Sequence, residues 1–503
     1  MRTVGSQHGI VWWLSMILAL APSVGCAGSV SSYAPAMLTD RAPAVPVVAP
    51  AAATDQDNDG PPPLTRAPRN DAPPSELHLS NGVRVLFVER HGLPLVSVGF
   101  LLRFDPSEAV NPVPDLYARA MKSSAQRSPR TPYSFLAAAG VTTYASCNTD
   151  VLVFGATMLA PHATEVIDHL SSALAAPAFG SRDLDLGERD LLAHRAWLRK
   201  NPSAHAAVQR MLLGDPHPAR VRVFDVESIR APSLDDLARF GRAYLSAENL
   251  TVAIVGDFRR AAVVSVLEAR LGSLRRASPP RASRTKLPPW SEPAPPAIAR
   301  VAIVPWRGAT QSKISVAFAG PSPRSDDRAA LLLVRELLSA FSGRLMRKIR
   351  EEQGASYGVG AVIEWWRTGG AFEIGTSVEA GHTVATVDAI VREVARLGVD
   401  PIPDDELARA KGRVTARTTS SGGSPYDKDL YVLETVASQD LPLDAFVRLG
   451  RQLDALTAED VRAAAARYLR TDRMQIAVAA DPAAVEAPLR ALGIGDVSIA
   501  PPP

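Results

Sequence analysis

An internal duplication is the strongest constraint that this sequence places on its fold. The segment LVSVGF at 95–100 returns as KISVAF at 313–318, an offset of 218 residues. The longer segment SLDDLARFGRAYLSAENLTVAIVGD at 233–257 returns as TAEDVRAAAARYLRTDRMQIAVAAD at 457–481, an offset of 224 residues. Because the two offsets nearly agree, the two copies have almost the same length and differ by small loop insertions. A chain of 503 residues is therefore expected to contain two homologous domains.

Each copy has the pattern of an α+β domain. In the first copy, VRVLFVE at 83–89 and VLVFGATM at 151–158 are predicted strands, and ATEVIDHLSSALA at 163–175 is a predicted helix. The order is two strands, a helix, two more strands, several helices and a last strand. Strands that follow one another directly, with helices grouped together, favour an antiparallel-rich sheet over a doubly wound one. We expect two tandem lobes, each an antiparallel-rich sheet with helices packed on one face.

Segments rich in Pro and Ala separate the expected domains. The apolar fraction of 46% is high enough for substantial cores. Residues 26–75 show no hydrophobic period and are expected to form a tether, and the Pro-rich residues 277–297 are expected to link two domains. The predicted organisation is a signal peptide at 1–25, the tether, domains at 76–276 and 298–490 with the linker between them, and a tail at 491–503.

The N-terminus has the pattern of an export signal. Arg2 precedes an apolar run from Ile10 to Ala21, which is too short to span a bilayer and matches the hydrophobic region of a secretory signal. Cys26 follows Ser-Val-Gly and resembles a bacterial lipoprotein site, where such a cysteine is lipidated and becomes the mature N-terminus. The alternative is an ordinary signal peptide cut near residues 19–27. Both readings predict a protein of the cell envelope, and lipidation predicts anchoring to the outer membrane on its periplasmic side.

The segment SGRLMRKIREEQGASYGVGA at 342–361 carries the clearest functional motif. Its first part has helix formers at helical spacing, Gly354 ends that helix, and a strand pattern follows. Arg350 lies seven residues before Tyr357. This segment resembles the signature of the second half of insulinase/pitrilysin-type zinc peptidases. The resemblance implies that Arg350 holds a main-chain carbonyl of the substrate and that Tyr357 donates to the carbonyl oxygen under attack. The alternative is an exposed charged helix face followed by ordinary strand packing.

The same resemblance indicates where zinc would bind in an active relative. The inverted motif His-x-x-Glu-His falls on the predicted helix 113–126, and its five positions are occupied by Leu116, Tyr117, Ala118, Arg119 and Ala120. The acidic pair expected on a second helix, 187–200, falls near His194 and Arg195. No two of the nine histidines are three or four residues apart, so no helix face presents a histidine pair. We expect no zinc and no other cofactor in this chain, and no peptide hydrolysis by the chain alone.

The edge strand within VTTYASCNTD, 141–150, also departs from the family. Catalytic relatives have an Asn-Ala pair there that pairs with an extended substrate, whereas this chain has Tyr144 and Ala145. The resemblance covers roughly residues 76–490 and therefore indicates a kept fold with lost metal residues.

The sequence predicts a non-catalytic or complementing subunit of an envelope zinc metallopeptidase. Its partners would be a zinc-bearing chain of the same family, a peptide substrate and, through Cys26, a membrane. The alternative is a catalytically dead peptide-binding or scaffold protein of the envelope. Lys plus Arg number 55 and Asp plus Glu number 52, and no basic run is interleaved with aromatic residues, which argues against a nucleic-acid partner.

Overall fold

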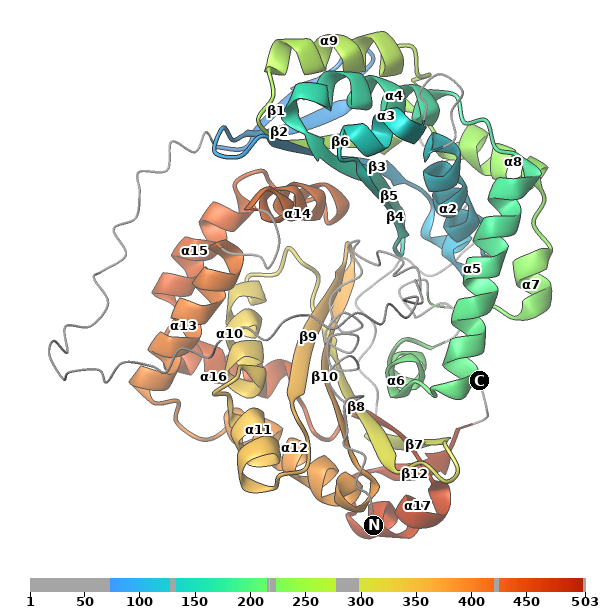
Figure 1. The fold of residues 1–503 in the computed structure, drawn as a ribbon. Helices are drawn as coiled ribbons and strands as arrows, with labels where there is room; N and C mark the ends of the chain where they lie inside the picture. The colour runs from blue at the N-terminus through green and yellow to red at the C-terminus, as the bar shows by residue number, and fades with distance from the viewer. Residues whose placement is uncertain are drawn as a thin grey trace, which may run out of the picture.

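The computed structural model describes residues 73–126, 133–214, 217, 223–276, 298–419 and 425–500. The signal peptide, Cys26, nearly all of the tether and the linker lie outside these residues. The described chain forms two six-stranded sheets, one from each half of the sequence, with helices around them (Figure 1). In this part of the chain, no helix combines the length and apolar character that crossing a membrane requires.

The first sheet has the strand order β1-β2-β6-β3-β5-β4, in which only β2 and β6 are parallel neighbours. Its strands are β1 (Ser75–His78), β2 (Arg84–Glu89), β3 (Leu95–Arg103), β4 (Thr142–Cys147), β5 (Val151–Leu159) and β6 (Leu250–Gly256). The helical segments of this half are η1 (Pro106–Val110), α2 (Val113–Gln126), α3 (Tyr133–Ala138), η2 (Ala160–His162), α4 (Ala163–Ala175), α5 (Ser181–Lys200), α6 (Ala204–Leu213), α7 (Val226–Arg230), α8 (Leu234–Tyr244), η3 (Ala247–Asn249) and α9 (Arg260–Leu271). The antiparallel-rich α+β architecture predicted from the sequence is confirmed.

The second sheet has the order β12-β7-β11-β8-β10-β9, and its β7 and β11 are again parallel. Its strands are β7 (Arg300–Pro305), β8 (Gln311–Gly320), β9 (Val359–Trp366), β10 (Gly369–Glu379), β11 (Gln475–Ala480) and β12 (Asp496–Ile499). The helical segments are α10 (Arg328–Ser339), α11 (Arg344–Met346), η4 (Arg347–Glu352), η5 (Ala380–His382), α12 (Thr383–Leu397), α13 (Asp404–Thr419), α14 (Pro425–Ser438), α15 (Ala445–Ala455), α16 (Ala458–Tyr468) and α17 (Pro482–Ala491). Because β12 pairs with β7, the second lobe extends beyond residue 490 into the predicted tail.

The two repeats that revealed the duplication occupy matching places in the two lobes. The segments 233–257 and 457–481 each form a helix and then a central strand, α8 with β6 and α16 with β11. Ser233 and Thr457 begin these helices with the same reciprocal cap, in which the side-chain oxygen accepts from the backbone N–H three residues on. Such caps typically contribute about 1 kcal/mol each. The sequence pattern therefore specifies the helix starts locally.

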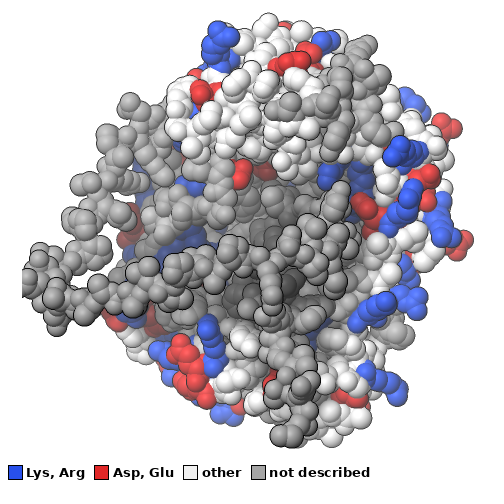
Figure 2. Space-filling view, viewed as in Figure 1, with Lys and Arg blue, Asp and Glu red and all other residues white. Residues whose placement is uncertain are grey.

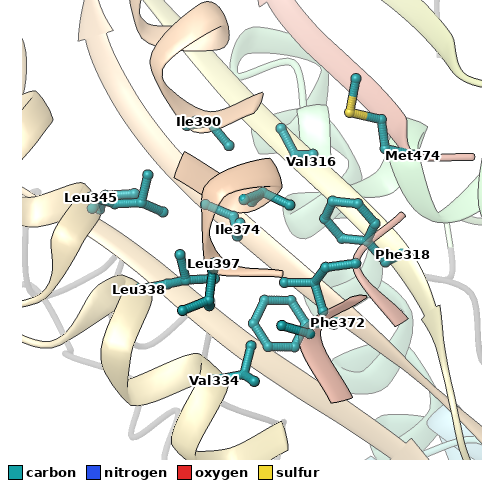
Figure 3. Packing of buried hydrophobic residues seen from close by; sticks show 14 of the residues in the cluster. Val316, Phe318, Val334, Leu338, Leu345, Phe372, Ile374, Ile390, Leu397 and Met474 are labelled. Atoms are coloured by element: carbon teal, nitrogen blue, oxygen red, sulfur yellow. The ribbon is translucent and has the colours of Figure 1, made fainter. Parts of the chain in front are cut away.

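One face of each sheet packs against its own helices. In the second lobe, Phe318 and Phe372 of the sheet contact a cluster that includes Leu338 of α10 and Leu397 of α12 (Figure 3). All four side chains are at most 2% exposed. Burying a side chain of this size contributes roughly 1.5–3 kcal/mol. This cluster is the hydrophobic core of the second lobe.

The other face of each sheet is covered by a helix from the opposite half of the chain. Helix α6 packs on the second sheet, where Val208 and Leu212 join a cluster with Ala317 and Ala477. Helix α14 packs on the first sheet, between the two halves in Figure 1, and its Leu433 is fully buried there. The predicted helices on one face of each sheet are present. In addition, one helix from the opposite half of the chain covers the other face of each sheet. Because both sheet faces are buried, central strands such as β3 and β6 are nearly continuous apolar runs.

Helix α6 also brings an ionisable side chain, that of His205, onto the second sheet. On α6, His205 Nδ1 lies 2.7 Å from Glu373 Oε2 of β10, and Gln209 donates to Glu364 of β9 at 2.6 Å. Burial alone would lower the pKa of His205, but the charge and hydrogen bond of Glu373 and the charge of Glu364 outweigh burial and raise the pKa to about 9. His205 therefore keeps its proton, and with it the attraction to Glu373, to a higher pH than an ordinary histidine.

Figure 2 shows side chains of both charge signs interspersed over the visible surface around the rim of the molecule. Among the described residues, several oppositely charged side chains pair along one helix, such as Arg392 Nε with Asp388 Oδ2 at 2.8 Å and Arg462 Nη2 with Glu459 Oε1 at 2.6 Å. Exposed pairs of this kind contribute little to stability.

Candidate functional site

The segment that carries Arg350 and Tyr357 folds as a helix, a turn and a strand, as its sequence predicts. The helical part comprises α11 and the π-helical η4, and β9 begins at Val359. Between them, Gly354 has φ +62°, and a Cβ added there would meet no atom within 4 Å. Glycine is therefore favoured at this turn by the left-handed backbone and not by lack of space.

Buried residues and an ion pair fix the helical part in place. Leu345 and Ile349 are fully buried in the core of the second lobe. Arg344 forms a two-pronged ion pair with Glu406 of α13, with nitrogen–oxygen distances of 2.9 and 2.8 Å. The remaining face of the helix carries Arg350, which is exposed and stacks over the ring of Phe341 with its guanidinium 5.0 Å from the centroid. Among the described residues, no carboxylate pairs with Arg350.

Tyr357 is presented on a rigid turn while its ring stays in solvent. Ser356 Oγ donates to the Ser377 carbonyl at 2.7 Å and accepts from Gly358 N–H at 3.1 Å, and Thr376 Oγ1 donates to the Gly358 carbonyl at 2.8 Å. The Tyr357 side chain is 79% exposed. This exposure argues against ordinary strand packing and leaves the phenol able to donate to a ligand.

The positions that correspond to the zinc motif lie on α2, and most of them belong to the first core. Leu116, Tyr117 and Ala120 are fully buried. The Tyr117 ring centroid lies 5.1 Å from those of both Phe179 and Phe240, and burial raises the pKa of its hydroxyl. A buried neutral phenol and two apolar side chains do not fit a zinc site, which requires several deprotonated nitrogen, sulfur or oxygen ligands together.

The outer face of α2 packs on α5, the second helix of the expected zinc site. Arg119 Nη1 lies 3.6 Å from Asp190 Oδ2 across the contact between the two helices. Burial and the positive charge of Arg119 lower the pKa of His194 on α5. Arg195 donates to the Phe224 carbonyl at 2.8 Å. In the part of the chain that the structure describes, no three His, Cys, Asp or Glu side chains are grouped to hold a metal.

Tyr144, which stands in place of the substrate-pairing residue, is engaged within the protein. Its hydroxyl donates to Glu434 of α14 at 2.8 Å. A Cβ at Gly155 would overlap the Tyr144 hydroxyl, and one at Gly99 would overlap the Glu434 carboxylate. These two glycines face each other in the β3–β5 register. Their lack of side chains makes room for the Tyr144–Glu434 contact, which was not foreseen from the sequence.

Comparison with known proteins agrees with the predicted family. Residues 233–414 match the family model of the peptidase M16 inactive domain. The fold is similar to a peptidase M16 inactive domain from Pseudomonas fluorescens, with TM-score 0.70 and 23% identity over 81% of this chain and 98% of that one. A protease from Helicobacter pylori gives TM-score 0.69 and 16% identity over 81% and 99% of the two chains.

A chain of complex III2 from Candida albicans, solved with Inz-5 bound, is also similar. It gives TM-score 0.65 and 17% identity over 81% of this chain and 95% of that one. No curated protein matches the sequence. The family match and the shared fold confirm the resemblance to the insulinase/M16-type peptidases, and the model that matches residues 233–414 describes the inactive domain of that family.

Proposed function

We propose that this chain, whose residues 233–414 match the model of the peptidase M16 inactive domain, is a complementing subunit of a zinc metallopeptidase. In this proposal a partner chain of the same family holds zinc in an intact His-x-x-Glu-His motif. This chain supplies Arg350 and Tyr357 to the partner's site. By itself it cleaves no peptide.

The observation that carries the proposal is the contrast between the two lobes. In the first lobe, the positions expected to hold zinc are filled by core residues such as Leu116 and by Arg119. In the second lobe, Arg350 and Tyr357 are exposed on a segment fixed by buried residues and hydrogen bonds. The exposed phenol of Tyr357 on a hydrogen-bonded turn supports a role in contacting a substrate.

The proposed chemistry assigns each side chain a separate role. Tyr357 donates its hydroxyl hydrogen to the substrate carbonyl oxygen, where negative charge develops as the bond is attacked. Arg350 donates from its planar guanidinium to a neighbouring main-chain carbonyl and so fixes the substrate's position. The partner's zinc, when bound, supplies the activated water.

A scaffold role is the second candidate function, and the similarity to a chain of complex III2 favours it. The similar chain from Candida albicans belongs to complex III2, a larger assembly. By analogy, this chain would bind a peptide or assemble envelope proteins without cleavage. Arg350 and Tyr357 would then have no role in turnover.

Native purification with metal analysis tests the proposal. A tagged copy of the chain, purified from the organism that produces it, should co-purify with a zinc-bearing homologue and with stoichiometric zinc. The chain expressed alone should carry no stoichiometric zinc and leave an unstructured peptide intact. Tightly bound zinc in the isolated chain, with peptide cleavage that a chelator abolishes, would contradict the proposal.

The proposed location is the periplasmic side of the outer membrane, with lipid attached at Cys26. One acyl chain gives only marginal membrane binding, whereas two or more give stable anchoring. Replacing Cys26 with Ser should therefore release the protein into the soluble fraction or block its processing, as followed by fractionation. Cys147→Ser is the matched control, since Cys26 and Cys147 are the two cysteines of the chain. Unchanged membrane partition of Cys26→Ser would indicate an ordinary signal peptide instead.

A further inference from the structure

A lysine between two tryptophans lies on the α6-covered face of the second sheet. Along β8, Ile314 and Val316 face the core, so the alternating Lys313 faces the opposite side, as does Ala317 beneath α6. Lys313 Nζ lies 4.9 Å from the ring centroid of Trp306, beyond β7, and 5.8 Å from that of Trp197 on α5. The two halves of the chain thus contribute one ring each.

Lys313 has no carboxylate partner among the described residues. Buried or partly buried cations are normally paired with an acid, because removing a charge from water is costly. Lys348, in contrast, forms an ion pair with Glu352 at 2.6 Å. Lys313 is partly buried, and this burial lowers the pKa of its ammonium. Trp197 is 47% exposed, so the group of side chains remains open on one side.

The register of the second sheet places Lys313 near the turn that carries Tyr357. Lys313 is the β8 partner of Ser377 on β10, and the Ser377 carbonyl accepts the hydrogen bond from Ser356. Lys313 is therefore separated from the turn by one strand. Two strand spacings of about 4.8 Å amount to roughly 10 Å. An extended peptide covers that distance in about three residues.

We propose that Lys313, Trp306 and Trp197 form a binding site for a carboxylate of the peptide substrate. The backbone at Lys313 lies only two strand spacings from the turn that carries Tyr357, so one peptide can contact both, a link that rests on the proposed function. The indole faces hold the ammonium by cation–π attraction and exclude water, which strengthens its attraction to an anion. The carboxylate is supplied either by the peptide C-terminus or by an Asp or Glu side chain.

Peptide binding to the full chain without any partner tests this site. Three peptides share one sequence: the first is neutral with an amidated C-terminus, the second has a free C-terminus, and the third is amidated with one internal Glu. The change in tryptophan fluorescence reports binding. At least one carboxylate peptide should bind about tenfold more tightly than the neutral one, in the range expected for a hydrogen bond to a charged group. The second and third peptides distinguish the two sources of the carboxylate.

Variants locate the effect at Lys313. Lys313→Met should abolish the preference for the carboxylate peptide, and Lys313→Arg should retain most of it. Lys200→Met, which removes an exposed lysine of α5 and has the same net charge as Lys313→Met, should keep the full preference. Equal binding of all three peptides, no binding of any, or an unchanged preference in Lys313→Met would overturn the site. Because no cleavage is measured, the outcome is independent of whether a zinc-bearing partner exists.

Discussion

Replacing His205 with Ala should lower the free energy of unfolding by about 3–5 kcal/mol, because it leaves a buried carboxylate without its cation. That carboxylate is Glu373, whose side chain is 1% exposed and lies 2.7 Å from His205. Its second oxygen, Oε1, already has no hydrogen-bond partner. The pair joins α6 of the first half to the sheet of the second half, so the change weakens the contact between the lobes. Denaturant unfolding followed by circular dichroism measures the loss.

Two comparisons isolate the burial of this pair as the cause. His91 lies at the same 2.7 Å from Asp257, but their side chains are 63% and 41% exposed. His91→Ala should therefore cost less than about 1 kcal/mol. The double variant His205→Leu with Glu373→Leu should recover part of the loss, since apolar residues often replace a buried ion pair without penalty while Glu364, whose Oε1 lies 3.6 Å from His205 Nε2, keeps its carboxylate. Equal losses for His205→Ala and His91→Ala would contradict this account.

The effect of His205 should depend on pH in a defined direction. The pKa of His205 is raised from 6.5 to about 9, so the folded state holds its proton more tightly than the unfolded state. The resulting stabilisation is complete below pH 6.5 and disappears as the pH rises through about 9. The difference between the natural protein and His205→Ala should shrink over that range.

Local patterns predicted the secondary structure and the duplication well. The predicted helix at 163–175 has the same bounds in the structure, and the strands expected at 83–89 and 151–158 differ by one residue. These segments are specified by their own periodicity and caps. The helix–turn–strand around Gly354 was predictable for the same reason, since a left-handed turn residue leaves a local signal.

The contacts between the halves could not be predicted, because they depend on tertiary arrangement. Helices α6 and α14 are amphipathic like their neighbours, and nothing in their sequences shows that each covers the opposite sheet. The Tyr144–Glu434 hydrogen bond and the His205–Glu373 pair follow from that exchange. Residues that lie far apart in sequence leave no periodic signal for such pairs. The strand β12 in the predicted tail was missed because it is only four residues long.

Tyr357→Phe should lower peptide turnover by the complex about a hundred-fold or more, the usual cost of losing one oxyanion donor. Phenylalanine keeps the exposed ring and removes only its hydroxyl, so the turn and the assembly should be unaffected. Arg350→Ala should raise KM as well as slow turnover, since its proposed role is to position the substrate. Arg347→Ala, in the same helical segment and also exposed, and Tyr431→Phe, 39% exposed on α14, are matched controls that should keep full activity.

The most direct test of the central claim is to measure turnover of one peptide by the purified complex. The complex with the natural chain is compared with the complex that contains Tyr357→Phe, at equal assembly and equal zinc content. A complementing subunit predicts a large loss of kcat in Tyr357→Phe with the complex intact. Equal turnover by Tyr357→Phe, Arg350→Ala and the natural chain in a verified complex would contradict that role and leave the scaffold function in its place.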